Sequence, residues 1–219
     1  MVQPKLDEYS KAGYTIARGV VDSDVVGHAR RHAEWTIDFN RNLTSEQLHQ
    51  KMLWTDDPFY LYLIRQPGLV DLAQQLIGPD LAVFATAYIV KEPGNSPAVL
   101  WHQDGSYWPL EPMEVVTLWL AVDPSTPENG CMRVVPGTQV MDLQEMQATP
   151  GGGNVLGSAM PDDKVDANKA VDLVLEPGDV SVHHPNIVHG SNANTSTIRR
   201  CGLTIRYIPT STRIVTDTP

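Results

Sequence analysis

The sequence predicts a mainly β fold, a sandwich or barrel, with helices flanking it. Signals for helix starts and stops gather in the first 78 residues, whereas the rest of the chain consists of short segments rich in β-branched and aromatic residues. The chain has 219 residues, of which 42% are hydrophobic, and this suffices for one domain with a sizeable core. We therefore expect a single domain over residues 1–219, with a mostly helical part at 1–78 and a β core at 79–210.

The first expected elements are a strand and a helix. Residues 13–21, GYTIARGVV, show the alternation of a short strand. Asp22 or Ser23 then offers a side-chain oxygen that caps a helix through VVGHARRHAEWTIDFNR.

Two more helices are expected before the β part begins. Thr44 and Gln47 have the spacing of a capping box, which predicts a helix over EQLHQKM. Pro67 is favourable in a first turn and precedes LVDLAQQLI, and Gly78 is suited to the end of that helix.

The predicted strands follow Gly78 and are bounded by Gly, Pro, Asn or Asp. In chain order they are LAVFATAYIVK, AVLWHQD, EVVTLWLAV, CMRVV, VDLVL, DVSVHH and RRCGLTIRYI. One long connection, residues 139–170, contains few apolar residues and the run Pro150-Gly151-Gly152-Gly153. Because long loops in compact domains are usually functional or disordered, we expect a lid or insertion near a site.

Composition and charge exclude several classes of protein. The net charge is −10 with no cluster of Lys or Arg, which disfavours binding to nucleic acid or to an anionic membrane. No apolar run approaches the roughly 20 residues of a membrane helix, and the N-terminus lacks the features of a signal peptide. We expect a cytoplasmic protein with two reduced thiols, Cys131 and Cys201, and a small-molecule substrate. The sequence does not predict the oligomeric state.

A metal site is suggested by His102-Gln103-Asp104 at the end of a predicted strand. Residues two apart on a strand point to the same face, so His102 and Asp104 offer a nitrogen and an oxygen to one ion. A third ligand would come from His183, His184 or His189. Two histidines and one carboxylate form the facial triad of non-haem Fe(II) oxygenases.

These motifs together resemble the phytanoyl-CoA dioxygenase family. They are His102-x-Asp104, PENGCMRVVPGTQ, the turn EPGD, and HGSNANTSTIRR from His189 onward, and the resemblance covers about residues 88–207. It implies a double-stranded β-helix (a jelly roll) with N-terminal helices packed outside. It also implies an oxygenase that uses Fe(II), 2-oxoglutarate and O₂, releases succinate and CO₂, and binds iron through His102, Asp104 and His189.

The far carboxylate of 2-oxoglutarate would need a cation, and a guanidinium suits it best. Arg199 and Arg200 are adjacent, so they point to opposite faces of the last long strand. Arg200 lies on the face of the strand whose other residues are small or polar: Gly202, Thr204 and Arg206. Arg199 lies on the apolar face and is interpreted as a surface or rim charge. The family spacing also selects Arg200.

Three further residues match positions beside 2-oxoglutarate in the family. Ser191, in HGS, matches a residue that helps to hold the same carboxylate. Trp119 matches a tryptophan beside the co-substrate, although a strand tryptophan is equally often part of the core. Ala87 matches a strand position that contacts 2-oxoglutarate in relatives.

The substrate side is less defined. Tyr107 and Trp108 directly follow the metal motif and are expected at the cavity mouth, unless they pack under the first loop. Lys91 would meet an anion or would extend to the surface, and Arg206 would meet a substrate carboxylate. The short chain favours a small metabolite or an intermediate of natural-product biosynthesis. Asp104 favours hydroxylation over halogenation, since the resemblance implies that halogenases lack this carboxylate.

Two other classes of function remain open at this level. A cupin-like metal-dependent hydrolase or isomerase would use the same three ligands for zinc, without 2-oxoglutarate. A non-catalytic binding module would keep the fold alone. The arrangement of HGS and Arg200 favours the hydroxylase, and the full ligand set argues against the binding module.

Overall fold

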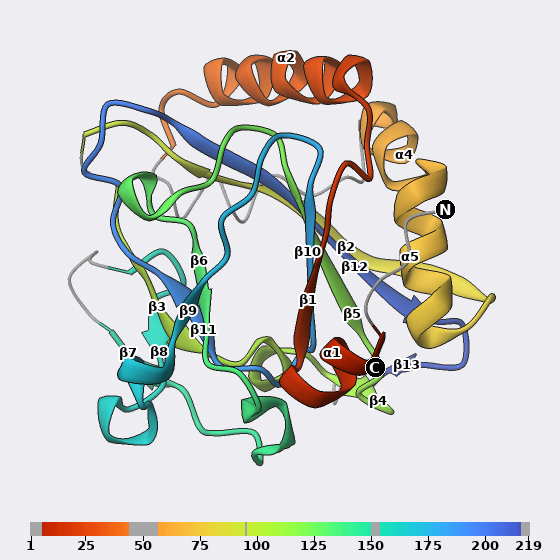
Figure 1. The fold of residues 1–219 in the computed structure, drawn as a ribbon, viewed down its shortest axis with the longest axis vertical. Helices are drawn as coiled ribbons and strands as arrows, with labels where there is room; N and C mark the ends of the chain where they lie inside the picture. Colours follow the sequence, from red (N-terminus) through yellow and green to blue (C-terminus); the bar gives the residue numbers. More distant parts are fainter. Residues whose placement is uncertain (1–5, 44–56, 95, 150–153, 216–219) are drawn as a thin grey trace.

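The computed structural model describes residues 6–43, 57–94, 96–149 and 154–215, and it is built on two antiparallel sheets (Figure 1). The major sheet has the strand order β1-β10-β5-β12-β2, and the minor sheet has the order β3-β11-β6-β9. This is the double-stranded β-helix that the sequence predicts. In the described ranges, no helix has the length and apolar character needed to cross a bilayer.

The strands of the major sheet are β1 (Tyr14–Ala17), β2 (Leu81–Lys91), β5 (Val116–Ala121), β10 (Val180–His183) and β12 (Arg200–Pro209). Those of the minor sheet are β3 (Val99–His102), β6 (Met132–Val134), β9 (Val171–Asp172) and β11 (His189–Ser191). Two small ribbons pair β4 (Leu110–Glu111) with β13 (Arg213–Ile214), and β7 (Gln147–Ala148) with β8 (Ser158–Ala159).

The helices gather on one side of the major sheet (Figure 1). α2 (Ser23–Phe39) begins at the N-cap Asp22, whose carboxylate accepts from two backbone amides, and α5 (Pro67–Ile77) begins at a proline and ends at Gly78, as predicted. α1 (Leu6–Ala12) and α4 (Pro58–Ile64) were not expected from the sequence. The helix predicted over EQLHQKM, with its Thr44–Gln47 capping box, lies outside the described residues.

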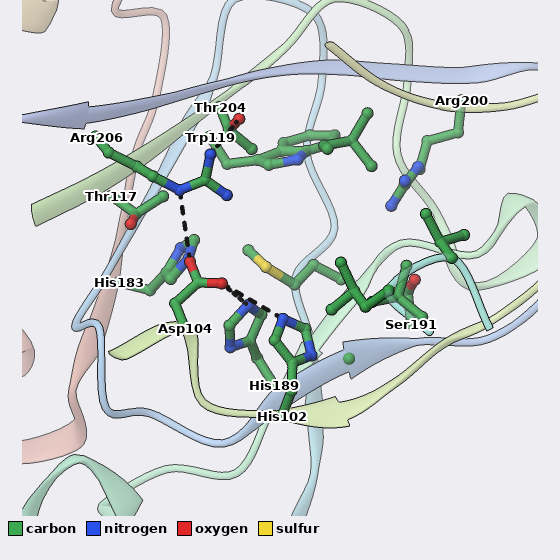
Figure 2. Close-up of a pocket in the computed structure, with 16 residues that line it drawn as sticks. His102, Asp104, Thr117, Trp119, His183, His189, Ser191, Arg200, Thr204 and Arg206 are labelled. Atoms are coloured by element: carbon green, nitrogen blue, oxygen red, sulfur yellow. Dashed lines mark hydrogen bonds and ion pairs between the residues drawn. The ribbon is translucent and has the colours of Figure 1, made fainter. Parts of the chain in front are cut away.

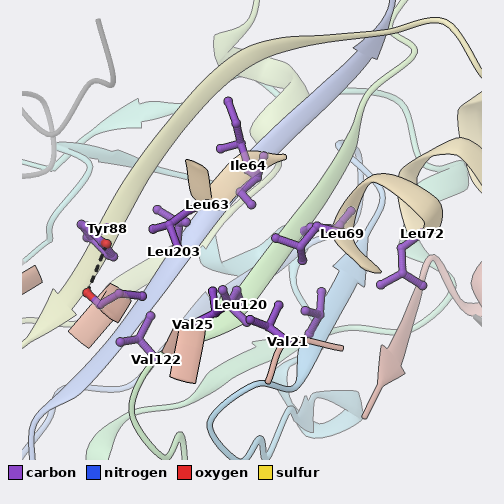
Figure 3. Close-up of a cluster of buried hydrophobic side chains, with 14 of the residues drawn as sticks. Val21, Val25, Leu63, Ile64, Leu69, Leu72, Tyr88, Leu120, Val122 and Leu203 are labelled. Carbon is purple, nitrogen blue, oxygen red and sulfur yellow. Dashed lines mark hydrogen bonds between the residues drawn. The ribbon is translucent and has the colours of Figure 1, made fainter. Parts of the chain in front are cut away.

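The main hydrophobic core fills the space between these helices and the outer face of the major sheet. Figure 3 shows helix residues meeting strand residues there, and the labelled side chains are Val21, Val25, Leu63, Ile64, Leu69, Leu72, Tyr88, Leu120, Val122 and Leu203. Alternate residues of each strand face this core, so the residues between them face the interior of the β-helix. On β12 the core face carries Cys201, Leu203, Ile205 and Tyr207, as the sequence analysis expected.

The long connection has little regular structure in its described residues, 139–149 and 154–170. It contains the ribbon β7–β8 and three 3₁₀ turns, and Val155 and Leu156 within it reach the pocket described below. The two halves of the β-helix thus form a scaffold, and this connection contributes to the wall of the pocket.

Candidate metal centre and active site

Two neighbouring strands of the minor sheet bring the three predicted ligands together. His102 is the last residue of β3, and β11 pairs with β3 so that His189 lies directly opposite His102. Gln103 keeps an extended backbone, with φ −116° and ψ 121°, and Asp104 then opens a 3₁₀ turn. Because the chain stays extended through Gln103, Asp104 lies on the same side as His102.

The donor atoms of these residues converge on one point (Figure 2). Asp104 Oδ1 is 3.5 Å from His102 Nε2 and 3.9 Å from His189 Nε2, and all three donors lie within 4.8 Å of one another. An ion bonded at about 2.1 Å would hold adjacent ligands about 3 Å apart, so a small closure would complete the site. Within the described residues, this is the one cluster with the spacing of a metal site.

Backbone carbonyls fix both imidazole rings in the tautomer that a metal requires. His102 Nδ1 donates to the carbonyl of Leu100 at 2.8 Å, and His189 Nδ1 donates to that of Ile187 at 3.0 Å. A carbonyl only accepts, so the proton of each neutral ring lies on Nδ1. Nε2 of both rings is therefore left with a lone pair that points into the site.

The charges of the site also suit a metal. Burial by itself would raise the pKa of Asp104, but Arg206 and the two histidines outweigh it and lower the pKa below its usual range. Burial lowers the pKa of His189 well below its usual value. The carboxylate is therefore ionised and His189 is neutral at neutral pH, which are the forms that bind a metal.

A buried guanidinium lies in the same pocket. Arg200 is 2% exposed, and Nη1 donates to the carbonyl of Gly130 at 3.0 Å, whereas Nε and Nη2 have no hydrogen-bond partner. Burial lowers its pKa to about 10, so it is still charged at neutral pH. Burying a cation whose N–H donors have no partner lowers the stability of the fold unless an anion binds to it. Arg200 is therefore a buried cation that faces the pocket and lacks an anionic partner.

Two neighbours shape this anion site. The indole of Trp119 lies 5.3 Å from the guanidinium of Arg200, and the hydroxyl of Ser191 is buried in the pocket without a partner. Gly202 makes room for the ring, because a Cβ there would lie 2.0 Å from Trp119 Cζ2. These residues leave donors for both oxygens of a carboxylate.

Residues of both sheets line the pocket. Its other end is formed by Arg206, Thr117 and His183 (Figure 2). Arg206 Nε is 3.8 Å from Asp104 Oδ2, and its guanidinium lies 5.1 Å from the ring of Trp108.

The other residues expected near the site lie beside the pocket rather than in its lining. Tyr107 is partly exposed and its hydroxyl bonds to Ser158, while Trp108 packs under Arg206. Ala87 is buried behind Thr204. Lys91 is 1% exposed and pairs across the sheet with Arg200, and Nζ donates to the carbonyl of Asn192, so it does not extend to the surface.

A third histidine, His183, lies at the site; the sequence predicted it only as an alternative metal ligand. The ring of His183 lies 4.9 Å from that of His189 and lines the pocket, whereas His184 faces away and accepts from the amide of Asn186. The alternation of β10 was the available signal, since it separates these two residues onto opposite faces. Arg199 is also not a rim charge, because it forms an ion pair with the buried Asp123 at 2.7 Å.

Comparison with known proteins shows which protein family this chain is similar to. The family model for phytanoyl-CoA dioxygenase (PhyH) matches residues 9–202. The chain is 33% identical over 175 residues to L-proline trans-4-hydroxylase of Streptomyces griseoviridis, covering 72% of this chain and 63% of that protein. It is 32% identical over 163 residues to a probable phytanoyl-CoA dioxygenase of Caenorhabditis elegans, covering 70% and 52%.

A solved structure shares the fold along nearly the whole chain. It is the non-haem α-ketoglutarate-dependent carbocyclase SnoK from nogalamycin biosynthesis, with a TM-score of 0.77 and 25% identity. The match covers 95% of this chain and 84% of that one. The chain spans between half and two thirds of the length of the curated relatives named above.

Proposed function

We propose, from the premise that this chain belongs to the phytanoyl-CoA dioxygenase family of Fe(II)/2-oxoglutarate oxygenases, that it hydroxylates an aliphatic C–H bond of a small molecule. The family assignment made from the sequence is confirmed, and Fe(II), 2-oxoglutarate and O₂ are the cofactor and co-substrates of that family. The reaction would convert 2-oxoglutarate and O₂ into succinate and CO₂ as the substrate is oxidised.

One observation carries the proposal. A three-donor metal site and a buried guanidinium that lacks an anion occur in one pocket. A dicarboxylate that reaches from the metal to Arg200 would bond to both ends at once. A hydrolase that used a metal alone would have no need for a buried guanidinium with two free nitrogens. The same argument disfavours a binding module without catalysis.

Each residue then has a distinct task. His102, Asp104 and His189 would hold the iron, which would supply the oxidising chemistry. Arg200 and Ser191 bind the far carboxylate of 2-oxoglutarate, and Trp119 closes one side of that site. The enclosed walls exclude water and fix the substrate C–H bond near the metal.

The substrate class rests on the relatives. We propose a small metabolite or an intermediate of natural-product biosynthesis. The relatives include a proline hydroxylase and a carbocyclase from nogalamycin biosynthesis. We also propose that the chain is one domain, and that its two buried, free cysteines reflect a reducing compartment such as the cytoplasm.

The test is O₂-dependent formation of succinate by the purified protein with Fe(II) and 2-oxoglutarate, measured with and without candidate small-molecule substrates. We expect His102→Ala to lose both iron binding and succinate formation. Arg200→Gln should keep the iron but raise the concentration of 2-oxoglutarate needed by about tenfold to a hundredfold.

Arg213→Gln is the matched control, because it removes the same charge from a residue that is exposed on β13. It should behave as the unchanged protein. If the wild-type protein binds iron but forms no succinate above background, the oxygenase proposal is wrong and a hydrolase becomes the better candidate.

A further inference from the structure

We propose that the substrate carries a carboxylate, or an anionic group of like geometry, that binds to Arg206 at the end of the pocket opposite Arg200. This inference rests on the proposed function and extends it to the class of substrate. It assigns Arg206, Thr117 and His183 as the residues that select the acid.

The three residues form one row across the major sheet. His183 on β10 pairs with Thr117 on β5, and Thr117 pairs with Arg206 on β12. Paired residues of neighbouring strands point to the same face, and this row faces the pocket. Figure 2 shows the row gathered around Asp104, away from Arg200.

Each member of the row has a buried polar atom without a hydrogen-bond partner, and for Arg206 the nearest carboxylate oxygen, Oδ2 of Asp104, is 3.8 Å from Nε, beyond hydrogen-bond distance. These atoms are Arg206 Nε, Thr117 Oγ1 and His183 Nδ1, and Thr117 and His183 are 0% and 2% exposed. The guanidinium of Arg206 donates only a long bond of 3.4 Å to Thr204 Oγ1. Buried polar groups in a folded protein are nearly always satisfied, so three orphans side by side indicate a polar ligand. A carboxylate accepts from a guanidinium, a hydroxyl and an imidazole N–H together.

The charges point to an anion rather than a neutral polar group. The two positive charges of Fe(II) match the two negative charges of 2-oxoglutarate, and Asp104 matches one of the two arginines. Asp104 is the one carboxylate among the residues that line the pocket. One guanidinium charge is left without compensation in a buried site, which favours a substrate with one negative charge.

Arg206 is too far from Arg200 to share its ligand. The two residues are six positions apart on the same face of β12, which places their Cα atoms roughly 20 Å apart along the strand. The metal ligands lie between the two ends in Figure 2. Arg206 thus serves the open side of the metal, where a substrate must lie.

The position also limits where oxidation occurs. Arg206 contacts the outer oxygen of Asp104, whose inner oxygen faces the two histidines. An acid group bound to Arg206 would therefore lie near the metal, with only the side chain of Asp104 between them. The C–H bond that reaches the metal should lie within a few bonds of the acid carbon, as in a small amino, hydroxy or cyclic acid.

The test uses protein loaded anaerobically with Fe(II) and 2-oxoglutarate, whose visible charge-transfer band reports on events beside the iron. Pairs of an acid and its primary amide are added: proline, valine, hexanoic acid, 3-hydroxybutyric acid and benzoic acid. We expect at least one acid to shift the band and to stimulate succinate release when O₂ is admitted. Its amide should need at least about a tenfold higher concentration.

Variants assign the effect to Arg206. Arg206→Gln should abolish the preference for acids while the affinities for iron and 2-oxoglutarate change by less than about threefold, and Arg206→Lys should keep part of it. Arg213→Gln, which removes an exposed charge, should leave the preference unchanged.

Three results would overturn the inference: no acid shifts the band, amides act as well as acids, or Arg206→Gln loses iron instead of selectivity. An acid that bleaches the band has displaced 2-oxoglutarate at Arg200 and counts against it too. If the band never forms in the wild-type protein, the proposed function itself fails. If the band forms without selectivity, only this inference fails.

Discussion

Gly202→Ala is the substitution for which the structure gives the most definite outcome. A Cβ at this position would lie 2.0 Å from Cζ2 of Trp119 and 2.3 Å from Cε2 and Cη2. Ordinary contact begins at 3.4 Å, so the ring has to retreat by about 1.4 Å. Trp119 is 3% exposed, lies against Arg200 and lines the pocket, so the ring can move only by giving up its place in the 2-oxoglutarate site.

We expect this change to lower the free energy of unfolding by about 1–3 kcal/mol, as in other overpacked cores. The same movement takes the indole off the 2-oxoglutarate site. Loss of the contact with Arg200 should weaken 2-oxoglutarate binding by about tenfold, which corresponds to about 1.4 kcal/mol. Denaturant unfolding gives the first quantity, and titration of the anaerobic Fe(II) protein gives the second.

Two further variants make this prediction specific. Gly27→Ala on α2 is the matched control, because its Cβ would meet only Arg31 Nη1 at 3.7 Å, and it should stabilise the fold by up to about 1 kcal/mol. Trp119→Phe combined with Gly202→Ala should regain part of the lost stability, since the smaller ring leaves room. If Gly202→Ala changes neither stability nor 2-oxoglutarate binding, the packing of Trp119 described above is incorrect.

Other predictions follow from the same contacts. Thr117→Val removes a buried hydroxyl without a partner, so it should leave the melting temperature unchanged or higher while the response to acids weakens; a clear loss of stability would contradict this. Burial and Arg200 lower the pKa of Lys91 to about 6, below the 10.5 of an unfolded chain. Because the unfolded chain then binds the extra proton, the free energy of unfolding should increase as pH rises from about 6 to 10.5. Lys91→Met should flatten that rise in stability and add up to about 3 kcal/mol at pH 7, measured by denaturant unfolding across pH. Saturating Fe(II) or Ni(II) should raise the melting temperature of the wild-type protein but not of His189→Ala, with a chelator reversing the effect.

Local patterns in the sequence were enough to predict much of the fold and part of the site. The alternation on β12 separated Arg200 from Arg199, and the structure places these residues on the pocket face and the outer face. The two-residue spacing of His102 and Asp104 put both on one side of the chain, although Asp104 lies in a 3₁₀ turn beyond the strand. Such features depend on residues that are near in sequence.

Features that depend on strand register were not predictable in this way. The row of His183, Thr117 and Arg206 joins three strands that are far apart in the chain, and only the pairing brings it together. The pairing of Lys91 with Arg200 is of the same kind, and it buries a lysine that the sequence placed at a surface or at an anion. α4 was missed because its short run, PFYLYLI, is rich in aromatic residues that favour strands.

The central claim concerns which residues hold the iron and the co-substrate, and a crystal structure of the protein soaked anaerobically with Fe(II) and 2-oxoglutarate tests it most directly. We predict iron bonded to Nε2 of His102 and His189 and to Asp104, with the far carboxylate of 2-oxoglutarate paired with Arg200. Iron bonded to His183, or 2-oxoglutarate paired with Arg206, would contradict the account.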